Sequence, residues 1–338
     1  MKTSGFACSL LLLLVHTSFA AEKKQLTPEN FERVSAVYAK IVGQLAQAHP
    51  KYQKMYNPIL RKDQAYIEYQ SAFFSDVIVA GGILSDGSIL VVLNKDTLEV
   101  LSLNNLPVWN YYMSSESKSE ANRQRIPKWN YESAVVAARK YLEAVNVKVP
   151  DGFILNCISF DTWFHSRWEV RWQPAFSHIP YDNGQLYNYP QSICVIFTES
   201  GELESVTSAS PIVFPASKEI KIDEESAIIK ASRCAPLVME TPFYKQRREG
   251  GFVIKSMKEV KLVVNTPNWL LDPNRAIWMT KEPPKEARIA WKVVFSTVDG
   301  QEIYDSKDSK RASLKLSPPD IIVFIDAATG ECVGANFT

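Results

Sequence analysis

The cysteines are the residues of this chain best suited to covalent chemistry. The four that follow residue 20 are Cys157, Cys194, Cys234 and Cys332. An even number of cysteines in an oxidising compartment favours disulfides, with buried free thiols as the alternative. No C-x-x-C or H-x-x-x-H spacing occurs, so the sequence predicts no metal site.

Acid–base chemistry has few candidates. After residue 20 only His49, His165 and His178 could supply an imidazole base. The motifs of a G-x-S-x-G nucleophile, a zinc protease, a P-loop and a dinucleotide site are all absent. We therefore predict no catalytic residue and no cofactor. The 37 acidic residues could still include a catalytic pair of carboxylates. The alternative is therefore an envelope hydrolase that uses such a pair in a cleft between units.

Aromatic side chains are concentrated between Asp161 and Tyr189, in a segment bent by Pro174 and Pro180. Rings that carry a polar tip are favoured at binding surfaces, so this segment predicts a partner-binding surface. Its candidate residues are Trp163, His165, Phe176, His178, Tyr181, Tyr187 and Tyr189. The alternative is that most of these rings cover the core of a sheet.

The first twenty residues have the order of a secretory signal. Lys2 is followed by an apolar stretch from Phe6 to Phe19, and Ser18-Phe19-Ala20 forms a small-x-small cleavage site. The apolar stretch is shorter than the roughly 20 residues of a membrane span. We expect cleavage after Ala20 and a secreted or periplasmic protein, with a retained anchor as the alternative.

Charge and hydropathy narrow the class of partner. Removal of the signal takes one Lys and no acid, which leaves 37 basic against 37 acidic residues. A chain without net charge has no overall field that draws it to nucleic acid or to an acidic membrane. The longest later apolar runs, at 76–84 and 321–328, have the length of strands, so we predict no membrane span after signal cleavage.

Three amphipathic helices divide the chain. They begin at the capping residues Thr27, Asn130 and Asp223, and the third is expected to end at Pro236. Polar or proline-containing stretches separate the helical regions. The predicted organisation is a signal peptide at 1–20, a first unit at 21–104, a linker at 105–129, a second unit at 130–206, a linker at 207–221 and a third unit at 222–338.

Strand-like sequence follows each helix. Residues 167–172 (RWEVRW) alternate charge with bulk, which predicts that Trp168, Val170 and Trp172 face a core while the charges face water. The fold class predicted is α+β, in tandem units of one helix packed on an antiparallel β-sheet. The unit boundaries favour the disulfides Cys157–Cys194 and Cys234–Cys332, which would contribute about 3 to 5 kcal/mol each.

Each unit closes on an apolar strand, a polar turn and a second strand. In the last turn, Asp326 can bond the turn backbone and Gly330 can supply a positive φ. In the first unit Leu98 stands where the glycine is expected. We predict structural turns, because a calcium loop needs further oxygen ligands at fixed spacing.

This combination of elements resembles the PepSY domain family. The likeness rests on a capped helix with small inner residues, a Trp-x-Val strand and an Asp-x-x-Thr-Gly-Glu-like turn. The third unit matches through Ala227, Trp291, Val293, Asp326, Thr329, Gly330 and Glu331. The second unit matches through Ala134, Trp168, Val170, Gly201 and Glu202.

PepSY domains occur in the propeptides of secreted thermolysin-like proteases and in other exported proteins. The resemblance therefore implies a non-enzymatic module that inhibits, chaperones or otherwise binds a partner. We expect a protein or peptide partner, such as a protease or an envelope component. A purely structural envelope protein is an alternative, beside the hydrolase named above.

Overall fold

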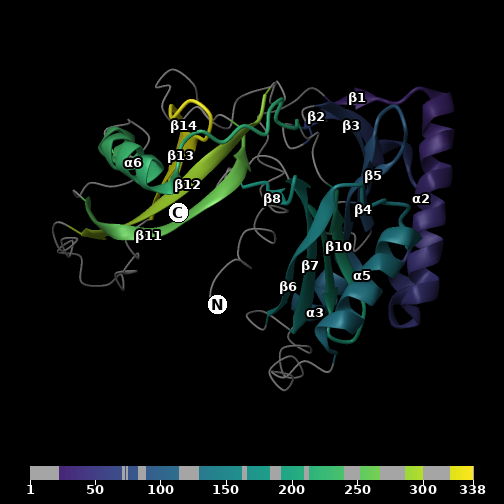
Figure 1. Ribbon diagram of the computed structural model, residues 1–338. Coiled ribbons are helices and arrows are strands. Elements are labelled where there is room, and N and C mark those ends of the chain that lie inside the picture. Colours follow the sequence, from purple (N-terminus) through teal and green to yellow (C-terminus); the bar gives the residue numbers. More distant parts are fainter. Residues whose placement is uncertain are drawn as a thin grey trace, which may run out of the picture. The chain divides into compact units, whose positions relative to one another are not determined.

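A computed structural model shows the fold of the protein (Figure 1). It contains two compact units: unit 1 is Met1–Pro174 with Asn188–Pro211, and unit 2 is Ala175–Tyr187 with Ile212–Thr338. The residues that the structure describes are 23–70, 73, 75–82, 89–113, 129–161, 166–182, 192–208, 213–239, 252–266, 286–299 and 320–337.

The fold class is α+β, which confirms the prediction. Three times along the chain, a helix is followed by four main strands that pair in chain order. The first repeat is α2 (Pro28–Ala48), β2 (Ala65–Gln70), β3 (Ser75–Gly81), β4 (Ile89–Asn94) and β5 (Val100–Asn105). The second is α5 (Tyr131–Ala144), β6 (Phe153–Asp161), β7 (Arg167–Phe176), β9 (Ile193–Thr198) and β10 (Leu203–Thr207). The third is α6 (Glu224–Met239), β11 (Phe252–Asn265), β12 (Arg288–Asp299), β13 (Ile321–Asp326) and β14 (Cys332–Phe337).

The helices α2, α5 and α6 begin at their predicted caps. A side-chain oxygen of the cap accepts a hydrogen bond from a backbone N–H three residues later, which typically stabilises a helix by about 1 kcal/mol. The bonded pairs are Thr27 with Asn30 at 3.3 Å, Asn130 with Ser133 at 2.8 Å and Asp223 with Ser226 at 2.8 Å.

The first and second repeats share one sheet, which corrects the prediction of three separate units. Their last strands, β5 and β10, pair antiparallel with Leu103 opposite Val206. The strand order is β1-β2-β3-β4-β5-β10-β9-β7-β6, with β1 (Lys24–Gln25) at one end. Each repeat therefore satisfies backbone N–H and C=O groups along the last strand of the other.

Part of the predicted linker at 105–129 is a helix of unit 1. This helix, α3 (Leu106–Met113), directly follows β5, and the Val108 side chain on it is fully buried. The sequence 106–113 (LPVWNYYM) is apolar enough to pack, so it belongs to the fold rather than to a connector.

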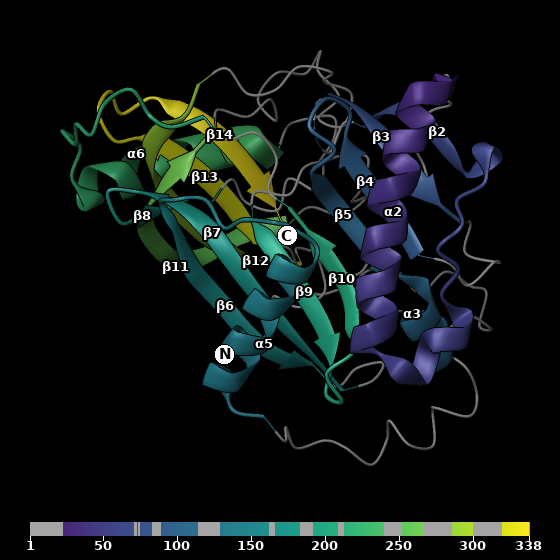
Figure 2. The same cartoon turned by 90° about the vertical axis from the view of Figure 1, so that its right-hand side faces the viewer.

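The core of unit 1 lies between the sheet and the two helices α2 and α5, which cover the same face (Figure 2). Trp168, Val170 and Trp172 point into this core and are at most 1% exposed, as their alternation predicts. The α2 residues Tyr38 and Leu45 pack against the same cluster. Full burial of each such side chain contributes about 1.5–3 kcal/mol.

Of the three charged residues of β7, Arg167 and Glu169 are buried and Arg171 is partly buried, which contradicts the prediction that they face water. Arg167 and Glu169 are each 5% exposed on the opposite face of the sheet. Arg167 Nη1 lies 4.0 Å from Glu204 Oε2 on β10, and Arg171 donates a hydrogen bond to Glu169. These pairings offset part of the desolvation cost that strict alternation would avoid.

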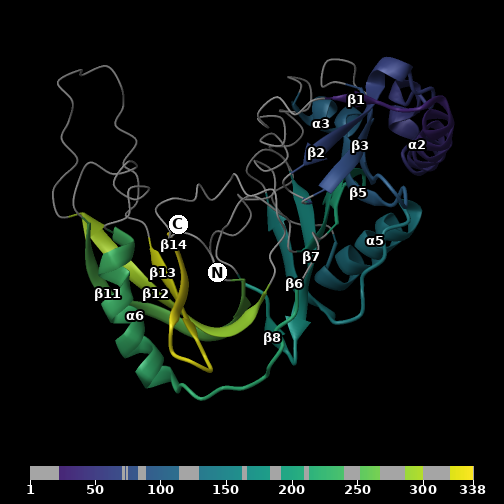
Figure 3. The ribbon, with the colours of Figure 1, turned by 90° about the horizontal axis from the view of Figure 1, so that it is seen from above.

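Unit 2 is one helix on a four-stranded sheet of order β11-β12-β13-β14 (Figure 3). The alanines 227, 231 and 235 of α6 are fully buried against the strands, because small side chains let the helix lie close to the sheet. The Trp291 indole N–H donates to the Ile222 carbonyl at 2.8 Å. Among the helices that the structure describes, none combines the length and apolarity needed to cross a membrane.

The helix α6 continues past its predicted end. Pro236 lies inside it, although proline cannot donate a hydrogen bond to the carbonyl of Ser232. Two residues further on, Val238 is fully buried in the unit 2 core. Burial of that side chain offsets part of the cost of the missing bond.

Candidate functional site

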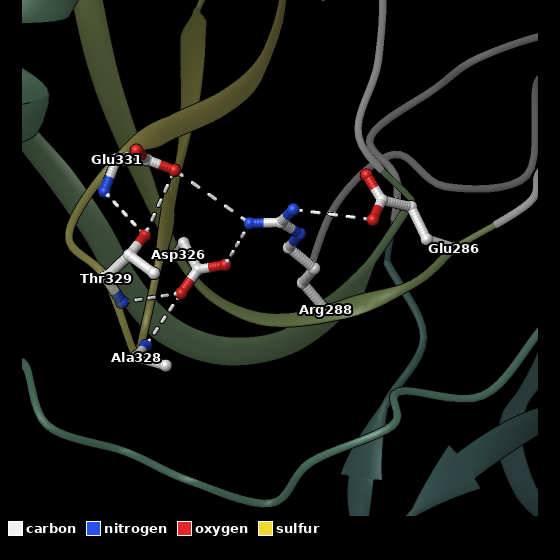
Figure 4. Close-up of polar contacts among 6 residues, drawn as sticks. All are labelled: Glu286, Arg288, Asp326, Ala328, Thr329 and Glu331. Atoms are coloured by element: carbon white, nitrogen blue, oxygen red, sulfur yellow. Dashed lines mark hydrogen bonds and ion pairs between the residues drawn. The ribbon is translucent and has the colours of Figure 1, made fainter.

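The turn of the third repeat is held by its own side chains (Figure 4). Asp326 Oδ1 accepts hydrogen bonds from the N–H groups of Ala328 and Thr329, both at 2.8 Å. Gly330 takes a φ of +76° and donates its N–H to the Asp326 carbonyl at 2.8 Å. The turn is therefore a closed backbone structure, as predicted.

Arg288 of β12 binds the second carboxylate oxygen of Asp326. Its Nη1 atom donates to Asp326 Oδ2 at 3.0 Å and lies 4.0 Å from Glu331 Oε2, while Nη2 donates to Glu286 at 3.4 Å (Figure 4). Burial raises the pKa of Asp326, but the Thr329 N–H and the Arg288 guanidinium together bring it below its usual value. The carboxylate thus serves the fold, with its charge neutralised by Arg288.

The first repeat has the same turn without the glycine. Asn94 Oδ1 accepts from the N–H groups of Asp96 and Thr97 at 2.9 and 3.0 Å. Leu98 takes the left-handed conformation that Gly330 has in the third repeat, with a φ of +58°. The likeness between the turns is therefore structural, although the sequence lacks the residue that favours it.

A buried polar cluster joins the first and second repeats inside unit 1. His49, at the end of α2, accepts a hydrogen bond at Nε2 from the Leu203 N–H of β10 at 3.2 Å. Asn105 Nδ2, on β5, donates both to the Leu203 carbonyl at 2.8 Å and to the Tyr56 hydroxyl at 2.9 Å. These bonds satisfy the backbone at the point where the two repeats meet.

Burial sets the protonation states in this cluster. It lowers the pKa of His49 to about 4, against a smaller opposing effect of the Ala48 backbone, so the imidazole is neutral near pH 7. Burial also raises the pKa of Tyr56 to about 12, with the Asn105 hydrogen bond acting against it and the Glu202 charge adding to it. Both rings therefore act as neutral hydrogen-bonding groups.

The turn between β9 and β10 continues this cluster. Glu199 accepts a hydrogen bond from the Trp168 indole N–H at 2.6 Å and another from the Trp129 backbone at 3.3 Å. The Thr198 hydroxyl donates to the Glu202 carboxylate. The cluster holds the residue types of acid–base catalysis, but each of these bonds links segments of the fold. Within the described ranges, no three His, Cys, Asp or Glu side chains are grouped as a metal site.

The predicted aromatic surface is only partly described. Trp163, His165, Tyr187 and Tyr189 lie outside the described residues. Tyr181 is 2% exposed and Phe176 is half-buried, and both rings contact Phe214, so these two belong to a small apolar cluster of unit 2. This favours the alternative in which rings cover a core.

Among the described members of the predicted set, His178 is the exposed one. It follows Ser177 in a two-residue turn between β7 and β8 (Ile179–Pro180), and both residues have positive φ, +69° and +51°. Residues other than Gly, Asn and Asp rarely adopt this left-handed conformation, so the hairpin carries backbone strain.

The segment after β8 covers part of the outer edge of β11. Tyr181 forms a parallel bridge with Val264, and the Asp182 N–H donates to the Val264 carbonyl at 3.0 Å. The Asp182 carboxylate accepts from Lys292 Nζ at 2.7 Å and lies 3.4 Å from Lys261 Nζ. An extended piece of this chain is thus bound at the edge of the third repeat's first strand.

The first strand of the first repeat is covered in a similar way. The two residues of β1 pair antiparallel with β2, with Lys24 opposite Ile67 and Gln25 opposite Tyr66. Two of the three repeats therefore bind a short extended segment along the outer edge of their first strand.

The first strand of the second repeat, β6, has no strand along its outer edge among the residues that the structure describes. Ile154 and Leu155 on it are 40% and 43% exposed. Its sequence from Phe153 to Phe160 contains no charged residue. Edge strands without charge accept further strands readily, so β6 is the candidate functional site.

The other sheet edges are protected differently. The exposed half of β11 carries Lys255, Lys258 and Glu259 and has two irregularities in its pairing with β12. On β14, Gly334 and Ala335 are buried. Charge, two bulges and burial oppose pairing with another strand at these edges. The β6 strand has one irregularity of its own, between Leu155 and Cys157, but it carries no charge from 153 to 160, so it is the more permissive edge in the described part of the chain.

The four cysteines after the predicted signal are free thiols in this structure. Arg171 of β7 lies between Cys157 and Cys194, as the cross-strand neighbour of both. Two strand spacings separate their Cα atoms by about 9–10 Å, beyond the roughly 7 Å that a disulfide spans. The predicted Cys157–Cys194 bridge is therefore not compatible with the sheet.

Comparison with known proteins assigns no family. No family model matches the chain, and no curated protein matches it. The Bacillus megaterium YpeB C-terminal domain is similar with a TM-score of 0.34 and 10% identity, over 93% of this chain and 98% of that one. An uncharacterized protein from Eubacterium rectale ATCC 33656 is similar with a TM-score of 0.41 and 11% identity, over 86% of this chain and 80% of that one. The PepSY resemblance therefore stays a prediction.

Sequence reasoning missed the β6 edge. The uncharged run from 153 to 160 predicts a strand, but only the sheet order shows that this strand is at an edge. The sequence indicates His49 only as a possible base, whereas the structure places it at the junction between α2 and β10. The signal for that junction was weak, because Leu203 lies 154 residues further along the chain.

Proposed function

We propose that this chain is an exported, non-enzymatic binding protein of PepSY-like architecture that holds an extended segment of a protein partner along β6. The observation that carries the proposal is the uncharged outer edge of β6, with Ile154 and Leu155 exposed on it. Export is supported by the secretory signal in the first twenty residues.

The chain itself indicates what kind of occupant such an edge takes. At β2 and β11, the equivalent edges bind extended segments through backbone hydrogen bonds. The side chains of β6 from 153 to 160 are uncharged and mostly apolar, so an uncharged segment with alternating apolar residues would match them. A protease or envelope protein that displays such a segment is the partner class we propose.

The test is peptide selection on the chain without its first twenty residues. The probe is a display library of unconstrained peptides, and the variants are Ile154→Lys on β6 and Ile229→Lys on α6. Ile229 is 49% exposed, so it matches Ile154 in side chain and in exposure. A lysine at the edge is expected to weaken binding of the selected peptides at least tenfold, while Ile229→Lys leaves it unchanged.

Three outcomes would contradict the proposal. The selected peptides could bind Ile154→Lys as tightly as the unchanged chain. The unchanged chain could sediment as a dimer that Ile154→Lys makes monomeric, in which case β6 pairs with a second copy. The selection could yield no binder while a substrate screen finds turnover, which would favour the envelope hydrolase.

A further inference from the structure

Cys234 and Cys332 lie side by side in unit 2. Cys234 is on α6 and Cys332 is the first residue of β14, and both pack against the cluster formed by the helix alanines and the strands. Cys332 Sγ donates to the Gly334 carbonyl at 3.7 Å, and the neighbouring Cys234 thiol adds to burial in raising the pKa of Cys332. The two cysteines thus lie near one another, at the contact between α6 and β14.

We propose that Cys234 and Cys332 form a disulfide that ties α6 to β14 when the exported chain folds in an oxidising compartment. The proposal rests on the export proposed above. The other two cysteines, Cys157 and Cys194, stay reduced because β7 lies between their strands.

The oxidant is a small or protein disulfide. The thiolate of one cysteine attacks a sulfur of that disulfide, forms a mixed disulfide and releases one thiol of the oxidant. The second thiolate then attacks the protein sulfur of the mixed disulfide, which forms the Cys234–Cys332 bond and releases the second thiol. The protein loses two protons and two electrons, and the oxidant gains them.

The packing of unit 2 determines when this exchange takes place. Burial, with the neighbouring Cys234 thiol, raises the pKa of Cys332 to about 12, so the reactive thiolate is scarce in the folded chain near pH 7. In the unfolded chain the thiol has its ordinary pKa of about 8.5. The bond should therefore form during folding, and form slowly once α6 has packed.

The experiment uses the full chain after its predicted cleavage site, refolded from denaturant in a buffer of oxidised and reduced glutathione. Free thiols are then alkylated, and the digest is mapped by mass spectrometry. We expect one cross-linked peptide pair that joins Cys234 to Cys332 and is two hydrogens lighter than its parts. Cys157 and Cys194 should both be alkylated. The same buffer added to the folded, reduced chain should give the bond at least tenfold more slowly.

Thermal unfolding supplies a second readout. Oxidation should raise the Tm of the transition that includes unit 2 on the order of 10 °C, because the bond closes a loop of nearly one hundred residues. Cys332→Ser should abolish this rise, and Cys157→Ser should keep it. Refolded chain with four alkylated cysteines, or with bonds that involve Cys157 or Cys194, would overturn the proposal. Neither result depends on a partner at β6, so the two proposals can fail separately.

Discussion

His49 accepts a hydrogen bond from the backbone N–H of Leu203, 3.2 Å from its Nε2 atom, and so ties the end of α2 to the first residue of β10. The helix of the first repeat is thereby fixed to the last strand of the second repeat. The bond requires a neutral imidazole, because a protonated Nε2 cannot accept.

The neutral state of His49 predicts a loss of stability in mild acid. Its folded pKa of about 4 lies below the unfolded value of 6.5, so the stabilisation is complete above pH 6.5 and is lost as the pH falls towards 4. A shift of this size corresponds to about 3 kcal/mol. Urea unfolding of His49→Gln, whose amide oxygen can still accept, should show a flatter dependence between pH 6.5 and 4. Equal slopes for both chains would contradict this assignment.

Gly330 predicts a backbone effect on stability. Alanine at this position would have a φ of +76°, with its Cβ 2.8 Å from the Lys230 Cε atom, so Gly330→Ala should destabilise unit 2 by about 1–2 kcal/mol. Gly43 in α2 is the matched control, because its added Cβ meets no atom within 4 Å. Gly43→Ala should raise the free energy of unfolding by about 0.5–1 kcal/mol. The same sign for both would contradict the account of the turn.

The Trp168–Glu199 bond predicts a large effect from one carboxylate. Glu199→Ala leaves the buried indole N–H without this acceptor, which should cost about 1–3 kcal/mol in the free energy of unfolding. Glu199→Gln keeps an acceptor oxygen at the same place and should cost less. Denaturant unfolding followed by tryptophan fluorescence measures both. Equal losses would mean that the carboxylate charge, rather than the acceptor, matters.

The strained turn at Ser177 and His178 predicts a stabilising double substitution. Asn-Gly suits a two-residue hairpin with two positive φ angles, so Ser177→Asn with His178→Gly should raise the free energy of unfolding by about 1 kcal/mol. It also removes the exposed imidazole of the predicted aromatic surface. If peptides selected on the chain lost affinity for this variant, the turn would belong to the binding site.

Local features of the fold could be predicted from sequence. Thr27, Asn130 and Asp223 begin helices because a side-chain oxygen beside a free N–H is a short-range effect. The burial of Trp168, Val170 and Trp172 follows from the period of a strand. Both need only neighbours in the chain.

The long-range pairings could not be predicted. The contact of β5 with β10 joins residues about one hundred positions apart, and nothing in the alternation of either strand specifies its partner. The strand order β5-β10-β9-β7-β6 places Glu204 of β10 near Arg167 of β7, with β9 between them, and so permits the buried charges on the opposite face. It also leaves β6 at the end of the sheet, which is why the candidate site appeared only in the structure.

Hydrogen exchange of the β6 backbone amides tests the central claim most directly. Binding of a selected peptide should slow exchange within Phe153–Asp161 at least tenfold and leave the amides of α6 and β14 unchanged, because only the edge amides gain partners. Slower exchange in unit 2 alone, or unchanged β6 amides in a saturated complex, would contradict the claim that partners bind along this strand.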